Sequence, residues 1–292
     1  MRPSRPCGVV IAARDEAASI GQCLEALREG LPAEFARVVI ACNGCRDGTV
    51  SIARTWAGGD WTVLDIPEPG KARAIRAAER MLPPGPRFYI DADVVFRGVD
   101  LVRIAGTLGL GGLHLVSPSI RHDLDGCNLL SRSLNRTWLA LPHARTHAFH
   151  HVLGVSEEGR GRWGEMPEVI GDDAFIASRF APHERRVMPG VFVVTRPPRS
   201  LAAWIGVRKR WLAGDRELRS LGLADPDVPP QVRALLRRSL SPRTAADGLL
   251  YTGVRCVTAI TAAFSRTRTT WYRDRTSRMA AASTPPLEHE DG

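Results

Sequence analysis

The first half of the chain alternates short apolar segments with longer amphipathic ones. Residues 18–29 are an example of the second kind, because Ile20, Leu24 and Leu27 share one helical face before Gly30 ends the pattern. Strands are expected over residues 8–13, 37–42, 62–66, 88–91 and 113–118. The alternation predicts an α/β fold with a Rossmann-like, mostly parallel sheet and helices on both faces.

The second half has a mainly helical pattern. Helices are expected over residues 124–151, 172–180, 201–221, 231–240 and 245–264. Residues 154–168 are rich in glycine and charge, which predicts a mobile loop that acts as a lid. Residues 185–195 predict two strands separated by a turn at Pro189-Gly190.

Length and composition permit one large catalytic domain, since the 292 residues are 44% apolar. We expect a catalytic domain over residues 1–221, a C-terminal helical extension over 222–265 and a disordered tail over 266–292. The first residues lack the design of a signal peptide. No stretch reaches the roughly 18 apolar residues of a membrane span. A cytoplasmic location is therefore expected.

The net charge of +9 is spread over most of the expected helices and does not form one block. Acidic residues at strand ends would repel phosphates, so nucleic acid is not an expected partner. Peripheral membrane contact through residues 208–219 or 245–264 is compatible with the pattern. Of the 40 basic residues, 38 are arginine, which draws attention to the two lysines, Lys71 and Lys209.

Two carboxylates follow directly on an apolar run in Asp91-Ala92-Asp93. Their position at the carboxyl end of a predicted strand suits a divalent cation, Mg²⁺ or Mn²⁺, whose coordination a substrate phosphate completes. Such an ion neutralises charge on a departing diphosphate. The alternative is a pair of solvated aspartates that open a turn.

A second acidic pair, Asp172-Asp173, stands at the start of a predicted helix. One of the two carboxylates can cap the helix. The other, beside a sugar-binding cleft, can act as general base on an acceptor hydroxyl.

Basic residues occur at two further positions of interest. Lys71 opens a helix after Gly70, where a lysine and backbone amides favour phosphate. Arg210 and Trp211 lie in an amphipathic helix, where the arginine suits diphosphate oxygens and the ring suits a sugar or the core. Solvent-facing basic side chains are the alternative for both sites.

These motifs occur together in one order along residues 8–214. The set comprises Arg14-Asp15-Glu16, Asn43-Gly44-Cys45-Arg46-Asp47-Gly48-Thr49, Gly70-Lys71, Asp91-Ala92-Asp93, Asp172-Asp173 and Arg210-Trp211. In this order the sequence resembles the family-2 group of inverting glycosyltransferases with the GT-A fold.

The resemblance implies roles for individual residues. Glu16 would contact the nucleoside of the donor, and Asn43 stands where an acidic residue commonly reads the base. Asp93 would be a direct metal ligand, and Asp91 would lie nearer the ribose or sugar and share the metal motif. Asp173 matches the catalytic base.

Arg210-Trp211 is similar to the end of a Gln-x-x-Arg-Trp motif, with Val207 at the glutamine position. This departure favours transfer of a single sugar over polymer synthesis. The implied reaction is displacement at the anomeric carbon of a nucleotide-diphosphate sugar, with inversion and with an acceptor that the sequence does not identify.

Other functions remain as alternatives. A catalytically degenerate donor-binding protein and a basic scaffold for anionic surfaces both fit the composition. A sugar-nucleotide pyrophosphorylase would need a glycine-rich loop after the first strand, and residues 12–18 contain no glycine.

Two clusters have no role in this scheme. His143, His147, His150 and His151 have helical spacing, which predicts a polar or interfacial helix more readily than a metal site. Cys42 and Cys45 form a Cys-x-x-Cys pair without the second pair that a zinc site needs.

Overall fold

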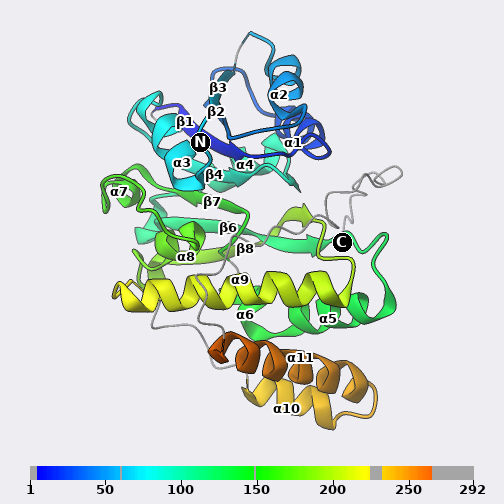
Figure 1. Cartoon of the computed structure of the whole chain (residues 1–292). Helices are drawn as coiled ribbons and strands as arrows, with labels where there is room; N and C mark the ends of the chain where they lie inside the picture. The colour runs from blue at the N-terminus through cyan, green and yellow to red at the C-terminus, as the bar shows by residue number, and fades with distance from the viewer. Residues whose placement is uncertain (1–4, 60, 148, 224–231, 265–292) are drawn as a thin grey trace.

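A computed structural model of the chain describes residues 5–59, 61–147, 149–223 and 232–264 (Figure 1). Its first half alternates strands and helices, as the pattern predicts. The elements are β1 (Cys7–Ala13), α1 (Ile20–Arg28), β2 (Ala36–Asn43), α2 (Thr49–Ala57), β3 (Thr62–Ile66), α3 (Lys71–Arg80) and β4 (Arg87–Asp91).

The second half adds strands to the same sheet and ends in long helices. Its elements are β5 (Val94–Val95), α4 (Gly98–Ala105), β6 (Leu115–His122), α5 (Leu129–Ala140), α6 (Pro142–Thr146), β7 (Val152–Val155), α7 (Glu157–Arg160), α8 (Asp172–Ala177), β8 (Arg185–Thr195), α9 (Leu201–Ser220), α10 (Val232–Leu240) and α11 (Ala245–Phe264). Two short 3₁₀ turns, Leu110–Gly112 and Pro182–Glu184, precede β6 and β8.

Within the described residues the strands form one sheet in the order β3-β2-β1-β4-β7-β6-β8-β5. β1 pairs in parallel with β2 and β4, β2 with β3, and β6 with β8, whereas β7 is antiparallel to both of its neighbours and β5 is antiparallel to β8. The mostly parallel sheet is therefore confirmed. The reversal at β7 brings the start of that strand beside the end of β4.

Apolar side chains alternate between the two faces of the sheet. Val9 and Ile11 of β1 pack with α1, α2 and α4, while Val10 packs with α3 and α8 on the other face. Because both faces are buried, the central strands are almost wholly apolar in sequence. Helices on both faces are thus confirmed.

The mobile loop expected over residues 154–168 is not present. Gly154 lies in β7 opposite Phe88, and Arg160 of α7 is bound to both carboxylate oxygens of Glu79 at 2.7 Å. Trp163 and Met166 are buried. Glycine at position 154 reflects close packing, since a Cβ there would lie 2.8 Å from Ile104. Residues 154 and 155 thus belong to the sheet, and the rest of the segment is packed against the protein, so the structure does not support the lid prediction.

The strand pair expected over residues 185–195 is a single strand. β8 runs parallel to β6 throughout, with Pro118 opposite Met188 and Ser119 opposite Phe192. Residues 189–191 therefore form a bulge in β8. The Pro-Gly pair signals this bulge and not a hairpin turn.

The C-terminal part is helical, as expected. α11 packs against α5 and α9, and α10 packs against α11. No helix in the described part of the chain has the length and apolar character needed to cross a membrane. The expected boundary at residue 222 stays a prediction, and the tail expected over 266–292 lies outside the described residues.

Candidate active site

The centre of the site is an ammonium group held between two carboxylates. Lys71, the first residue of α3, places Nζ 2.8 Å from Oδ1 of Asp91 and 3.0 Å from Oδ2 of Asp172. Asp91 ends β4, and Asp172 begins α8. One lysine thus connects three elements that are distant in sequence.

Two consecutive histidines extend this cluster in different directions. The Nδ1 atom of His151 lies 3.0 Å from Oδ2 of Asp91, and the Nδ1 atom of His150 lies 3.1 Å from Oδ2 of Asp173. His151 has a left-handed backbone with φ of 65°, which is uncommon for a residue other than glycine. This turn at the start of β7 directs the two rings to separate carboxylates.

The charges shift the ionisation of the cluster. Burial disfavours the charged forms of Lys71 and Asp91, but their ion pair and the neighbouring charges outweigh it, so the pKa of Lys71 is raised and that of Asp91 is lowered. Burial raises the pKa of Asp172 to about 6, against the effect of Lys71. Burial also opposes ionisation of Asp173, yet the hydrogen bond and charge of His150 lower its pKa. Asp173 is therefore an ionised carboxylate at neutral pH.

The donor set beside this cluster fits a divalent cation. Ligand atoms of Asp91, Asp93 and His151 all lie within 4.8 Å of one another. An ion with bonds of about 2.1 Å reaches atoms up to about 4.2 Å apart, so small side-chain rotations let the three residues share one ion. His151 was not among the predicted ligands, because it is 58 residues beyond Asp93 in the sequence.

A cavity with an empty volume of about 330 Å³ opens over the cluster. Its polar lining is Lys71, Asp91, His151, Asp172 and Asp173, so the two predicted acidic motifs face one space. Asp172 does not cap α8, because the N-cap position is Gly171 and Asp172 is paired with Lys71. Its role is electrostatic.

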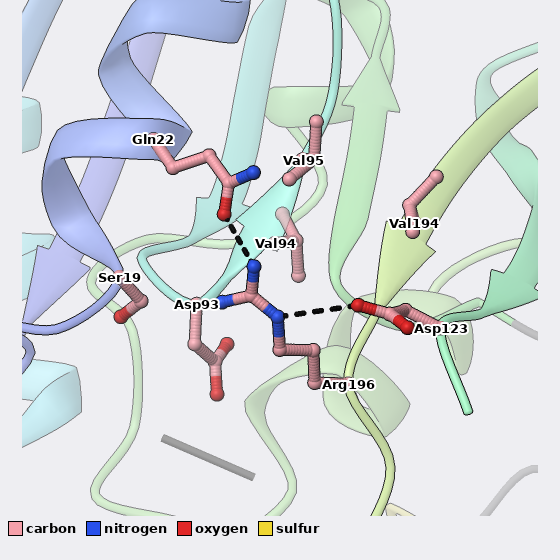
Figure 2. A pocket seen from close by; sticks show the side chains of 8 residues that line it. All are labelled: Ser19, Gln22, Asp93, Val94, Val95, Asp123, Val194 and Arg196. Atoms are coloured by element: carbon pink, nitrogen blue, oxygen red, sulfur yellow. Dashed lines mark hydrogen bonds and ion pairs between the residues drawn. The ribbon is translucent and has the colours of Figure 1, made fainter. Parts of the chain in front are cut away.

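Asp93 faces a second hollow on the other side of the β4 end. Figure 2 shows Arg196 in this hollow between Gln22 and Asp123, with Asp93 beside it. The guanidinium of Arg196 donates to Oε1 of Gln22 at 2.6 Å and lies 3.4 Å from Asp123. These contacts fix the floor next to the metal-ligand set.

The residues expected at the nucleoside are buried below the strand ends. Glu16 is 5% exposed and its carboxylate accepts a hydrogen bond from Ser19. Asn43 donates from Nδ2 to the Ala13 carbonyl and accepts from the Gly70 amide at Oδ1. Asn43 therefore ties the end of β1 to the start of α3, and its expected base contact stays a prediction.

α9 supports the segment that precedes Asp172 and Asp173. Oε2 of Glu217 accepts a hydrogen bond from the Ile170 amide, and Gly214 lies against Ile170 and Gly171. Trp211 is 37% exposed, with its ring 6.3 Å from that of Trp138.

The ring of Trp138 lies 6.3 Å from that of His150. Arg210 and Trp211 lie on α9, which packs next to the start of α8, and neither is among the residues that line the Lys71 cavity. Their donor-binding role stays a prediction.

The four histidines do not share a helix, which corrects the sequence interpretation. α6 ends at Thr146, so His143 lies within it and His147 is its C-cap, whereas His150 and His151 follow the helix. Burial, together with nearby positive charges, lowers the pKa of His143 to about 4. His150 and His151, which the spacing wrongly assigns to a helix, are the two histidines that reach the site.

The left-handed backbone of His151 gives a direct prediction. We expect His151→Gly to be more stable than His151→Ala by about 1 kcal/mol, because alanine bears the strain of this conformation and glycine does not. Urea denaturation measures the difference. The matched control is His150, whose φ is not positive. There the alanine variant is expected to be at least as stable as the glycine variant. Equal stability of the two His151 variants would contradict the strain assignment.

Solved structures with the same fold are glycosyltransferases. The mannosyltransferase PcManGT from Pyrobaculum calidifontis, solved with GDP-Man and Mn²⁺, matches with a TM-score of 0.60 and 24% identity over 90% of this chain and 78% of that chain. Glucosyl-3-phosphoglycerate synthase from Mycobacterium tuberculosis, solved with Mn²⁺ and UDP, matches with a TM-score of 0.54 and 17% identity over 76% and 82% of the two chains. These likenesses establish the GT-A fold.

This fold, together with a match to a family model, defines a glycosyltransferase of the GT-A class. Residues 8–160, more than half of the chain, match the family described as glycosyl transferase family 2. The chain belongs to that family. No curated protein shows significant similarity to the sequence.

Proposed function

We propose that this enzyme transfers one sugar from a nucleotide-diphosphate donor to an acceptor hydroxyl, with inversion and with a divalent cation. The observation that carries the proposal is the shared cavity, in which Lys71 stands beside Asp91 and His151 of the metal-ligand set and Asp173 faces the same space. Lys71 and the metal-ligand set would stabilise the leaving group, and Asp173 would remove the proton, so the two tasks fall to different residues.

Asp91, Asp93 and His151 would hold the cation. When bound, it would offset negative charge on the departing diphosphate. An imidazole in the set favours Mn²⁺ over Mg²⁺, since Mg²⁺ prefers oxygen ligands. Mn²⁺ is present in the related mannosyltransferase and synthase structures, which supports this choice.

Asp173 would take the proton from the acceptor hydroxyl, with His150 fixing its orientation through the 3.1 Å contact. Lys71 would keep Asp91 and Asp172 in place and offer positive charge toward the donor phosphates. Attack on the anomeric carbon from the Asp173 side, with the diphosphate leaving on the other, inverts the configuration.

Transfer of a single sugar is favoured by residue 207. Val207 replaces the glutamine of the Gln-x-x-Arg-Trp motif and is buried in α9, so it offers no polar group to a growing polymer. Arg210 and Trp211, one turn further along the same helix, are proposed to contact the donor.

Thermal unfolding with UDP, GDP, dTDP or CDP, each with Mn²⁺, Mg²⁺ or EDTA, tests the proposal. One diphosphate is expected to raise the midpoint only with a cation, since ligand at about 100 times its Kd adds about 2.7 kcal/mol of stability. Asp93→Ala should remove this shift, and Asp65→Ala, which alters an exposed carboxylate of β3, should keep it.

Two results would contradict the scheme. An equal midpoint shift in EDTA would exclude the proposed metal site. No response to any diphosphate would favour the alternative of a degenerate protein or a basic scaffold for anionic surfaces.

A further inference from the structure

The α10–α11 hairpin presents an unusual amount of apolar surface. Six of its large apolar side chains are more than half exposed among the described residues. They are Val232, Leu236 and Leu240 of α10, and Leu249, Val257 and Ile260 of α11. The inner faces of the hairpin already supply its packing, because Leu235, Tyr251 and Val254 belong to the main core cluster. The six outer side chains therefore add nothing to the described core.

On α10 the exposed side chains form a regular stripe. Val232, Leu236 and Leu240 are four residues apart and so follow one side of the helix. Arg233 and Arg237, each one residue further along, are exposed beside that stripe. An apolar stripe flanked by arginine is the pattern of a helix that lies in a membrane interface.

α11 has the same division of faces. Tyr251, Val254 and Thr258 are buried, while Leu249, Val257 and Ile260 point away from that side. α11 is fixed against α5 and α9 by its buried face. Its exposed apolar residues are therefore held outward by a rigid helix pair.

The charge of the hairpin is almost wholly positive. Residues 232–264 contain five arginines and one acidic residue, Asp247. Asp247 accepts a hydrogen bond from Ser133 of α5 at 2.6 Å and lies 3.6 Å from Arg136, so its charge is turned inward. Two copies of this surface would repel each other, whereas anionic headgroups would complement it.

We propose that the α10–α11 hairpin docks on an anionic membrane surface. The apolar stripe enters the boundary between headgroups and acyl chains, and the arginines bind lipid phosphates. α9, the other basic helix suggested by the sequence, does not face outward in this way. It lies between the sheet and the hairpin, and burial lowers the pKa of Arg208 (Figure 1).

The position of the hairpin agrees with this assignment. Figure 1 shows α10 and α11 at the end of the molecule opposite β2 and β3, with α9 between the hairpin and the sheet. Docking through the hairpin leaves the Lys71 cavity, at the end of β4 and the start of β7, free of the docked face.

Co-sedimentation of the full chain with vesicles tests the proposal. Vesicles of 70% phosphatidylcholine and 30% phosphatidylglycerol at 0.1 M NaCl are expected to bind the protein, and phosphatidylcholine alone or 0.5 M NaCl to release most of it. Leu236→Ser with Leu240→Ser should weaken binding at least about tenfold, because two apolar anchors are lost. Arg233→Gln with Arg237→Gln should weaken it by a similar factor.

Matched controls separate the hairpin from the surface as a whole. Leu110→Ser with Met81→Ser removes two apolar side chains elsewhere that are also more than half exposed, and it should leave binding unchanged. Arg37→Gln with Arg186→Gln removes two exposed arginines from β2 and β8 and should cost much less than the hairpin pair. Circular dichroism confirms that each variant folds.

Three results would overturn the proposal. The first is no binding of the wild-type chain to anionic vesicles. The second is an equal loss for hairpin and control variants, which would indicate general charge attraction. The third is a wild-type dimer in light scattering that Leu236→Ser with Leu240→Ser converts to a monomer, without vesicle binding, because the stripe would then join two copies. The assay contains no donor, so its outcome is independent of the transferase proposal.

Discussion

Asp173→Asn is expected to leave donor binding intact and to lower turnover by a factor of about 10² to 10⁴, the usual contribution of a general base. Asparagine keeps the shape of the side chain but cannot accept the proton of the attacking hydroxyl. Turnover is measured as release of the nucleoside diphosphate from its sugar donor, with water as acceptor. Donor binding is measured separately by the cation-dependent midpoint shift.

The control for this substitution is Asp125→Asn, which alters an exposed carboxylate in the loop before α5. It should change neither quantity. If Asp173→Asn releases diphosphate at the wild-type rate, Asp173 is not the base.

Lys71→Met, studied in EDTA, is expected to lower the free energy of unfolding by about 2 kcal/mol at pH 7.5. Removing one partner of a well-buried ion pair costs about 3 to 5 kcal/mol, and the partial exposure of Lys71 reduces that figure. Without the ammonium, Asp91 and Asp172 repel each other across the cavity. Lys209→Met alters the other lysine of the chain and should have little effect.

The loss in Lys71→Met should depend on pH in a defined direction. The folded-state pKa of Asp172 is already raised to about 6, so its ionisation costs stability as the pH rises through that value. Without Lys71 the pKa of Asp172 rises further, and the stability lost by ionising Asp172 at pH 7.5 becomes larger. The deficit should therefore shrink as the pH falls toward 5, where the carboxyl is protonated. A deficit that does not change between pH 5 and 7.5 would show that Lys71 does not neutralise this cluster.

The positions of Asp91, Lys71 and Asp172 were predictable from sequence because each stands next to a strong local signal. Asp91 comes directly after a buried apolar run, and Lys71 and Asp172 begin helices. Parallel strands bring their carboxyl ends to one edge, so local position was enough to place the predicted residues Lys71, Asp91 and Asp173 in one cavity.

His150 and His151 were not predictable in the same way. Their spacing from His143 and His147 fits a helix, and no local signal marks the end of α6 at Thr146. Their approach to the site depends on the antiparallel pairing of β7 with β4, which is a long-range property. The left-handed conformation of His151 completes the turn.

The lid prediction failed for a related reason. Glycine in a sequence signals either freedom of the backbone or lack of space for a side chain, and the pattern does not separate the two. At Gly154 the second applies, because Ile104 and Phe88 leave no room for a Cβ.

The charge balance around Lys71 bears on kinetics. The cavity is lined by three carboxylates, Asp91, Asp172 and Asp173, and by the ammonium of Lys71 and the imidazole of His151, so the negative groups outnumber the positive ones even when His151 is protonated. A dianionic diphosphate that arrives alone meets net negative charge, whereas a divalent cation is attracted. The site therefore favours a compulsory order, in which the cation associates first and the sugar nucleotide second. Steady-state rates of sugar transfer would then follow an ordered mechanism in which the cation binds first. Excess cation would not compete with the donor.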